Sequence, residues 1–341
     1  MKISNYRIDL ESVVDEVKKQ GYNLIGVQIP EGLKIHGLRI IDFLHSSTGK
    51  DFVLNVDPCF GACDIPYNSL KEIGADLIIH IGHLPISSVV KKTSLPILFI
   101  EAKADLKLEK TVEASIPFLV GSKVGVITTA QHIHVLEEIV EIIESNGLKV
   151  VIGEGDNRIS QKGLILGCNF SAATSISDDV DCFLFVGSGD FHPLGLLFNT
   201  KKPVVAADPY TGRVRVDELL DLKDMILKQR YGAIAMCRHA KRFGILLGLK
   251  PGQQRFNLAV EIKKKLEEIG KEAYLLSMDE FSPSKLLGLE KIDCFVSTAC
   301  PRIAIDDYLR YKIPMITPAE LDILLGLRKW SDYVFDQITE F

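Results

Sequence analysis

The sequence lacks a long apolar run, a secretion signal and an excess of basic residues. No unbroken apolar stretch reaches the roughly 18 residues that a bilayer span needs, so we expect no membrane partner. Residues 1–11 have neither the apolar centre nor the small-residue cleavage site of a signal peptide, which predicts a cytoplasmic protein. A formal net charge of −5 argues against a nucleic-acid partner bound through basic residues.

The composition is that of an ordinary globular protein. With 341 residues, 47% of them hydrophobic and 25% charged, the chain is long enough for two or three domains with ample cores. Seven cysteines are an odd number, and in a reducing cytoplasm disulfides are not their default use. Some of these cysteines are therefore candidates for metal binding or catalysis.

Strand and helix patterns alternate along the chain in three rounds of about a hundred residues. Gly26, Gly125 and Gly244 occupy equivalent places in the first strand of each round. Strands that alternate with helices indicate parallel sheets covered by crossover helices. We therefore predict an α/β fold of three similar small parallel-sheet domains, which span residues 1–103, 104–217 and 218–341.

One cysteine of each round lies in a loop, after a small residue and near a strand end: Cys63, Cys168 and Cys300. Loops at the carboxyl ends of parallel strands are where ligands collect. If the domains pack as a triangle with these loops inward, three thiolates meet and suit an iron–sulfur cluster or a three-ligand zinc site. Their wide spacing matches no compact metal motif, and spacing alone slightly favours unrelated loop thiols. The triangle is approximate, because Cys63 and Cys168 precede the third strand of their rounds whereas Cys300 follows it.

The other cysteines have plainer interpretations. Cys182 and Cys294 each follow an aspartate and begin an apolar strand, and Cys237 falls in a helical stretch. All three are predicted to pack as small apolar side chains. Cys59 and Cys63 would face one way in a helix and could share a metal. The neighbouring proline and glycine disfavour a helix there, which leaves the role of Cys59 open.

Several unusual strings occur in order along the chain, at residues 60–64, 128–134, 155–160, 166–170, 187–196, 208–211, 299–302 and 306–308. They closely resemble the archaeal diphthamide synthesis enzymes, the non-standard radical S-adenosylmethionine proteins of the pathway's first step. The resemblance covers nearly the whole chain, from residue 30 to residue 328. It implies three domains of similar fold around a central [4Fe–4S] cluster, with Cys63, Cys168 and Cys300 as the ligands.

The resemblance also implies the chemistry and the partners. S-adenosylmethionine binds the vacant iron, and one electron from the reduced cluster breaks its bond to the methionine Cγ. The products are 5′-methylthioadenosine and a 3-amino-3-carboxypropyl radical, which adds to an imidazole carbon of a histidine in translation elongation factor 2. The implied partners are this factor, a second copy of the chain in a homodimer, and an electron donor. Cys59 is not at the family's ligand position.

Seven residues near strand ends are candidates for holding S-adenosylmethionine. Gln253 opens a helix whose N-terminus favours a carboxylate, although a solvent-facing loop is the plainer alternative. Arg302 suits the methionine carboxylate or pairs with Asp306. Asp208 suits ribose hydroxyls, and turns rich in glycine offer free backbone N–H groups. The candidates are Gly187, Ser188, Gly189, His192, Asp208, Gln253 and Arg302.

Two other classes of function stay open at the level of sequence. A [4Fe–4S] Lewis-acid enzyme of the quinolinate synthase type also places three cysteines from three similar domains around one cluster. A non-catalytic binding module built on three α/β domains would not need its loop cysteines. Formation of 5′-methylthioadenosine would distinguish the radical transferase from both.

Overall fold

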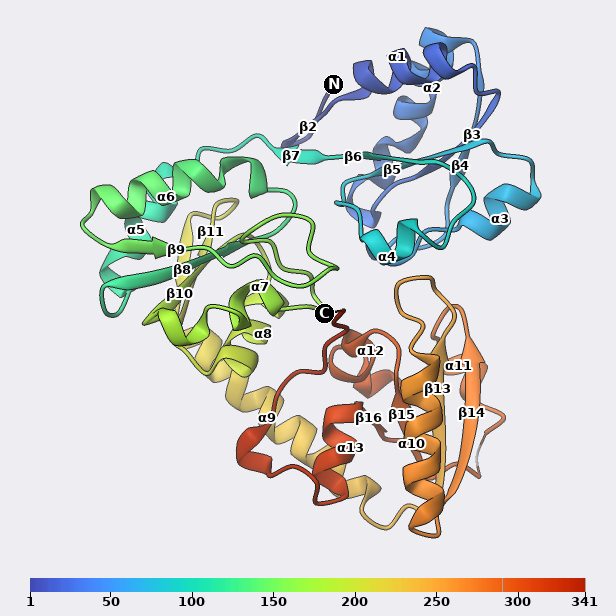
Figure 1. Cartoon of the computed structure of the whole chain (residues 1–341), viewed down its shortest axis with the longest axis vertical. Helices are drawn as coiled ribbons and strands as arrows, with labels where there is room; N and C mark the ends of the chain where they lie inside the picture. The colour runs from blue at the N-terminus through green and yellow to red at the C-terminus, as the bar shows by residue number, and fades with distance from the viewer. Residues whose placement is uncertain (290, 341) are drawn as a thin grey trace.

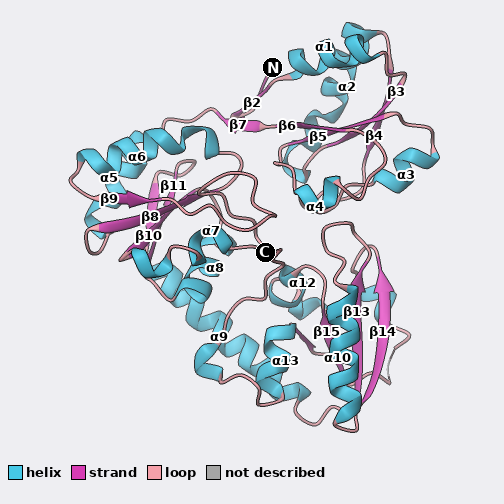
Figure 2. Cartoon of the chain, in the orientation of Figure 1, coloured by secondary structure: helices cyan, strands magenta, loops and turns pink. Residues whose placement is uncertain are grey.

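The chain folds into three α/β lobes, each built around a largely parallel sheet (Figure 1; Figure 2). The computed structural model describes residues 1–289 and 291–340. Figure 1 shows the lobes set around the C-terminal end of the chain. This arrangement confirms the predicted fold class. The predicted domain boundaries stay a prediction, and Phe341, which ends the third predicted range, lies outside the described residues.

The first lobe contains a parallel sheet in the order β4-β3-β5-β6. Its strands are β3 (Leu24–Gln28), β4 (Asp51–Asn55), β5 (Leu77–Ile81) and β6 (Ile97–Ile100). A small antiparallel sheet consists of β1 (Lys2–Ile3), β2 (Tyr6–Ile8) and β7 (Ala102–Ala104). The helices are α1 (Leu10–Gln20), the 3-10 helix η1 (Glu31–His36), α2 (Gly37–Thr48), α3 (Tyr67–Glu72) and α4 (Ser87–Val90).

The second lobe has a sheet in the order β12-β11-β10-β8-β9, in which only β12 is antiparallel to its neighbour. Its strands are β8 (Lys123–Thr128), β9 (Lys149–Val151), β10 (Cys182–Val186), β11 (Val204–Asp208) and β12 (Arg213–Arg215). The α-helices are α5 (Glu109–Ser115), α6 (Leu136–Ser145), α7 (Ser171–Thr174) and α8 (Phe191–Thr200). The 3-10 turns are η2 (Ile116–Phe118), η3 (Ile133–Val135) and η4 (Ser177–Asp179).

The third lobe contains a parallel sheet in the order β14-β13-β15-β16. Its strands are β13 (Arg242–Gly248), β14 (Glu272–Met278), β15 (Cys294–Ser297) and β16 (Met315–Ile316). Long helix α9 (Asp217–Cys237) leads into it, followed by α10 (Phe256–Glu268), α11 (Pro283–Leu286), α12 (Pro301–Ile305), η5 (Tyr308–Arg310), α13 (Pro318–Leu324) and η6 (Trp330–Asp332). No helix in the described part of the chain is long and apolar enough to cross a membrane.

The three sheets share one strand order, in which the first strand lies between the second and the third. The equivalent glycines lie in these first strands, β3, β8 and β13. A Cβ atom added at Gly26, Gly125 or Gly244 would overlap a packed side chain, at 2.6 Å from Leu70, 2.4 Å from Phe183 and 2.7 Å from Phe295 respectively. Close packing over the central strand therefore explains why the repeat has glycine at this place.

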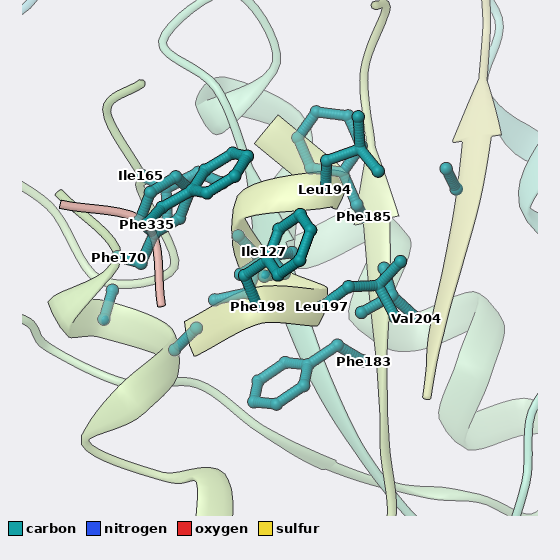
Figure 3. Close-up of a cluster of buried hydrophobic side chains, with 14 of the residues drawn as sticks. Ile127, Ile165, Phe170, Phe183, Phe185, Leu194, Leu197, Phe198, Val204 and Phe335 are labelled. Atoms are coloured by element: carbon teal, nitrogen blue, oxygen red, sulfur yellow. The ribbon is translucent and has the colours of Figure 1, made fainter. Parts of the chain in front are cut away.

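The core of the second lobe includes the end of the chain. Phe183 and Phe185 of β10 pack with side chains of α8 in one buried cluster (Figure 3). Phe335, which follows the third sheet in the sequence, joins this cluster and stacks on Phe198 with ring centroids 4.5 Å apart. The C-terminal segment thus crosses from the third lobe back to the second.

A buried ion pair joins α9 to the third lobe. The guanidinium of Arg230 donates to both carboxylate oxygens of Glu320 at 2.7 Å, and both side chains are fully buried. Arg230 also donates to the carbonyl of Met315, and the Tyr333 hydroxyl donates to Glu320. Because these polar groups have partners, the pair fixes how α9 packs against α13.

The structure corrects one expectation about the cysteines. Cys237, at the end of α9, and Cys294, at the start of β15, form a disulfide with Cα atoms 5.6 Å apart. The prediction that both only pack as thiols is wrong. Their sequence separation of 57 residues gave no sign of the pairing, which depends on α9 packing beside the third sheet. Cys182 is a free, buried thiol, as predicted.

Candidate metal centre

The three predicted ligand cysteines lie in loops beyond the carboxyl ends of strands. Cys63 lies between β4 and β5, and Cys168 lies between β9 and β10. Cys300 follows β15 and precedes the first residue of α12. All three are free thiols with part of their surface accessible. The predicted asymmetry is confirmed, since two of the loops precede the third strand of their sheets and one follows it.

The thiols influence one another electrostatically, although they come from three lobes. Burial raises the pKa of Cys63 to about 12, and the next largest contribution is the charge of Cys168. Burial also raises the pKa of Cys300, followed by the charges of Cys168 and then Cys63. The charge of Cys168 thus reaches the thiols of both Cys63 and Cys300, which places the three sulfur atoms in one region. Close, buried thiols repel each other as thiolates, and a bound cation would remove that repulsion.

A loop of the third lobe, the one before α10, contacts Cys63 of the first lobe. Gly252 donates its N–H to the Cys63 carbonyl at 2.9 Å, and the Gln253 side-chain amide donates to the Cys63 sulfur at 3.5 Å. Gln253 is only 4% exposed, so the solvent-facing alternative is wrong. The predicted helix start is also wrong, because α10 begins at Phe256. Gln253 therefore reaches the thiol region through its side chain and not through a helix N-terminus.

Arg158 places a buried positive charge beside Cys168. Its guanidinium donates to Glu340 at 2.9 Å and to the carbonyl of Gly252 at 3.0 Å, while its Nε is buried without a partner. Burial raises the pKa of Cys168, and the charge and hydrogen bond of Arg158 oppose that increase. A buried donor without an acceptor beside three thiols fits a sulfur-rich group bound between them. The sequence reasoning did not identify Arg158 as a site residue.

Arg255 is a second cation near the thiols. Its guanidinium donates to the carbonyls of Thr298 and Ala299, which fixes the backbone immediately before Cys300. It also pairs with Asp336 of the C-terminal segment at 2.5 Å. The charge of Arg255 opposes the rise in the Cys168 pKa, after the larger effects of burial and Arg158.

The C-terminal segment is the other part of the site that the sequence reasoning missed. Ile338 donates its backbone N–H to the Cys168 carbonyl at 2.8 Å, and its own carbonyl accepts from Asn169. Glu340 accepts hydrogen bonds from Ser88 of the first lobe and from Arg158 of the second. The signal in the sequence for this contact is the set of apolar residues near the end of the chain.

Two of the candidates for S-adenosylmethionine, Arg302 and His192, pack against the ring of Phe191. Arg302 pairs with Asp306 at 2.7 Å, which is one of the two partners that the sequence suggests for it. Its guanidinium also lies over the Phe191 ring, 4.5 Å from the centroid. His192 stacks on Phe185 with ring centroids 5.9 Å apart. Burial, followed by the charge of Arg302, lowers the pKa of His192 to about 4, so this imidazole is neutral near pH 7. Arg302 and His192 thus lie close together.

The remaining candidates lie at the carboxyl edge of the second sheet. Gly187, Ser188 and Gly189 follow β10, and Gly189 has φ +79° with open space where a Cβ would lie. Asp208 ends β11, is buried, and accepts from the Tyr210 N–H at 2.9 Å. The role of these backbone and carboxylate groups in binding stays a prediction.

Fold and site together define a three-lobed α/β protein in which one loop thiol from each lobe faces a shared region. The sequence matches the family described as "Putative diphthamide synthesis protein" over residues 29–334. The chain belongs to this diphthamide synthesis family, which confirms the resemblance found in the sequence.

Individual relatives agree with this assignment. The chain is 38% identical to the 2-(3-amino-3-carboxypropyl)histidine synthase of Pyrococcus horikoshii over 98% of this chain and 94% of that protein. It is 26% identical to subunit 1 of the Caenorhabditis elegans enzyme over 94% of this chain and 81% of that one. The crystal structure of Dph2 from Pyrococcus horikoshii with a 4Fe-4S cluster matches this fold with a TM-score of 0.89 and 36% sequence identity. The match covers 98% of this chain and 94% of that one. These relatives confirm the predicted enzyme class, a transferase of diphthamide synthesis.

Proposed function

We propose that this chain transfers a 3-amino-3-carboxypropyl group from S-adenosylmethionine to an imidazole carbon of a histidine in translation elongation factor 2, and releases 5′-methylthioadenosine. The observation that carries the proposal is that one loop thiol from each of three lobes lies in one region, where Gly252 donates to the Cys63 carbonyl and accepts from Arg158, the cation beside Cys168. The name of the Pyrococcus enzyme, a synthase of carboxypropyl histidine, supports transfer over the Lewis-acid alternative.

In this proposal the three thiolates hold a [4Fe–4S] cluster and leave one iron for S-adenosylmethionine. When bound, the cluster supplies the single electron that splits the sulfonium. Gln253 donates a hydrogen bond to the Cys63 sulfur, and the unpartnered Nε of Arg158 is available to donate to another sulfur atom. Both donors would stabilise negative charge on sulfur, and the buried Arg158 and the half-buried Arg255 offset the charge of the centre.

The candidate residues would orient the cosubstrate. Arg302 would release its ion pair with Asp306 and pair with the methionine carboxylate, since both partners are carboxylates. Neutral His192 offers a hydrogen bond without adding charge, and the open backbone at Gly189 leaves room for the adenosine. Together they would hold the methionine Cγ bond toward the iron and exclude water from the radical.

The proposal includes three partners: elongation factor 2 as the substrate, a second copy of the chain as a homodimer, and an electron donor. The cytoplasm, where elongation factor 2 works, is the proposed location. The printed names of the relatives support a protein histidine as the acceptor.

The experiment is a single incubation of anaerobic, dithionite-reduced protein with S-adenosylmethionine and archaeal elongation factor 2. We expect 5′-methylthioadenosine by chromatography and the mass of one aminocarboxypropyl group on the factor. A matched reaction uses Cys168→Ala protein, and a second uses Cys182→Ala, which removes a free, buried thiol at the start of β10. Modification of the factor without 5′-methylthioadenosine, or by Cys168→Ala as fast as by wild type, would refute the proposal.

A further inference from the structure

A second group of metal-binding side chains lies in the first lobe. Cys59, His80 and His83 place one sulfur and two imidazole nitrogens within 4.8 Å of one another. Cys59 and His80 are buried and His83 is partly exposed. Residues 59–63 are not helical, so the side chain of Cys59 faces these histidines and does not act as the helical partner of Cys63.

The hydrogen bonds around His80 determine which of its nitrogens carries the proton. The side-chain amide of Gln28 donates to the Asp64 carbonyl at 2.6 Å, so its oxygen faces His80 Nδ1 at 2.8 Å. Because an amide oxygen only accepts, Nδ1 of His80 must carry hydrogen. The lone pair of His80 Nε2 is therefore presented to His83, whose Nδ1 lies 3.1 Å away.

This arrangement is that of a metal-binding histidine. Ligating histidines usually donate their second N–H to an oxygen acceptor, which fixes the ring and its tautomer. Gln28 is that acceptor, and it is 1% exposed and itself held by the protein backbone. The pair thus orients a free nitrogen lone pair toward a thiol and a second imidazole.

The separations fit a small cation. Ligand atoms on a tetrahedral zinc ion, about 2.0–2.3 Å from the metal, lie about 3.3–3.6 Å from one another. The two imidazole nitrogens, 3.1 Å apart, already have nearly this separation. The three ligand atoms lie within 4.8 Å of one another, so movements of about 1 Å bring all of them to the separations that zinc requires.

We propose that Cys59, His80 and His83 bind a zinc ion, with the fourth position open on the partly exposed side of His83. One thiolate and two imidazoles are ligands that zinc favours. On binding, the thiol proton of Cys59 leaves to solvent, and the proton of His83 moves from Nδ1 to Nε2. Binding therefore releases about one proton per ion. The ion is separate from the three loop thiols.

The site has a direct connection to the proposed cluster loop. Cys59 and Cys63 lie in one loop, and Gln28 links His80 to the backbone of Asp64, the residue after Cys63. A bound ion would therefore hold both ends of the loop that presents Cys63. This inference does not depend on the proposed function, because it concerns different ligands and a different metal.

The test measures metal content in two backgrounds. Protein carrying its cluster is equilibrated anaerobically with zinc, freed of loose metal and analysed for zinc. The Cys63→Ala/Cys168→Ala/Cys300→Ala protein, which lacks the cluster's colour, is titrated with Co²⁺. We expect about one zinc per chain in the first, and thiolate-to-cobalt charge transfer with tetrahedral d–d bands in the second.

Matched variants separate this site from other thiols and histidines. His83→Ala and Cys59→Ser are expected to lose the zinc and the cobalt bands, whereas Cys182→Ser and His45→Ala keep them. His83 is partly exposed, so its replacement is expected to leave the circular dichroism spectrum unchanged. Folded wild-type protein without stoichiometric zinc, or His83→Ala protein with undiminished zinc, would overturn the site. A protein that binds zinc but yields no 5′-methylthioadenosine would refute only the proposed function.

Discussion

The side-chain amide of Gln253, from the third lobe, donates to the sulfur of Cys63, from the first, across 3.5 Å. This contact joins two lobes at a thiol that the proposed function assigns to iron. Hydrogen bonds to sulfur ligands stabilise the reduced, more negative form of an iron–sulfur centre and raise its reduction potential.

Gln253→Leu is therefore expected to lower the reduction potential of the reconstituted centre. A hydrogen bond contributes about 1 kcal/mol, which for one electron corresponds to about 40 mV. A redox titration followed by visible absorption measures the shift. Gln254→Leu is the control, because this neighbouring glutamine is exposed. Equal potentials in wild-type and Gln253→Leu protein would remove Gln253 from the set of tuning residues.

Gly252→Ala is expected to disturb, by steric overlap, the contact between the loop before α10 and Cys63. Its new Cβ would lie 2.5 Å from the Cα and Cβ of Cys63, and backbone atoms cannot rotate away as a flexible side chain does. We expect a loss of about 1–3 kcal/mol in unfolding free energy and a reduced iron content. Gly232→Ala in α9 meets nothing within 4 Å and should stabilise the helix by about 0.5–1 kcal/mol. Thermal unfolding and iron analysis of both variants provide the comparison.

Arg230→Met is expected to destabilise the protein by about 3–5 kcal/mol, because it leaves the Glu320 carboxylate buried without its cation. Arg230→Met/Glu320→Leu should recover much of this loss, since both buried charges are then gone. Urea unfolding gives the free energies. Lys263→Met, which breaks a partly exposed pair with Glu267, should cost less than about 1 kcal/mol. Similar losses for Arg230→Met and Lys263→Met would contradict the importance of the buried pair.

We predict that burial of His132 makes the unfolding free energy depend on pH. Burial, followed by the charge of His134, lowers its pKa from 6.5 to about 4, while Asp208 opposes the shift. Between these values the unfolded chain binds a proton that the folded chain excludes, so stability falls as the pH decreases from about 6.5 to about 4. His132→Gln should remove roughly 3 kcal/mol of this decrease. Urea unfolding at several pH values tests it, with exposed His239→Gln as the control; identical pH profiles for His132→Gln and wild type would exclude this contribution.

The fold was predictable because its signals are local and repeated. Gly26, Gly125 and Gly244 mark equivalent crowded strands, and apolar runs between helices define parallel sheets. The three loop thiols were predictable as candidates, since each follows a small residue at a strand end. Their convergence was not, because it depends on how the lobes pack.

The missed residues are those whose partners are distant in the sequence. Arg158 of the second lobe pairs with Glu340 near the end of the chain. Cys237 reaches Cys294 only once α9 has packed beside the third sheet. Gln253 was identified as a candidate, but only because it was expected to open a helix. That helix begins three residues later, at Phe256. Side-chain reach across lobes has no period or spacing in the sequence, so pattern analysis does not detect it.

The most direct test is the iron and sulfide content of anaerobically purified protein, measured for wild type and for Cys63→Ala, Cys168→Ala and Cys300→Ala. We predict brown wild-type protein with about four irons and four sulfides per chain, and a large loss of both in each variant, while Cys182→Ala stays like wild type. Wild-type protein without iron, or three variants that retain their full iron content, would contradict the account.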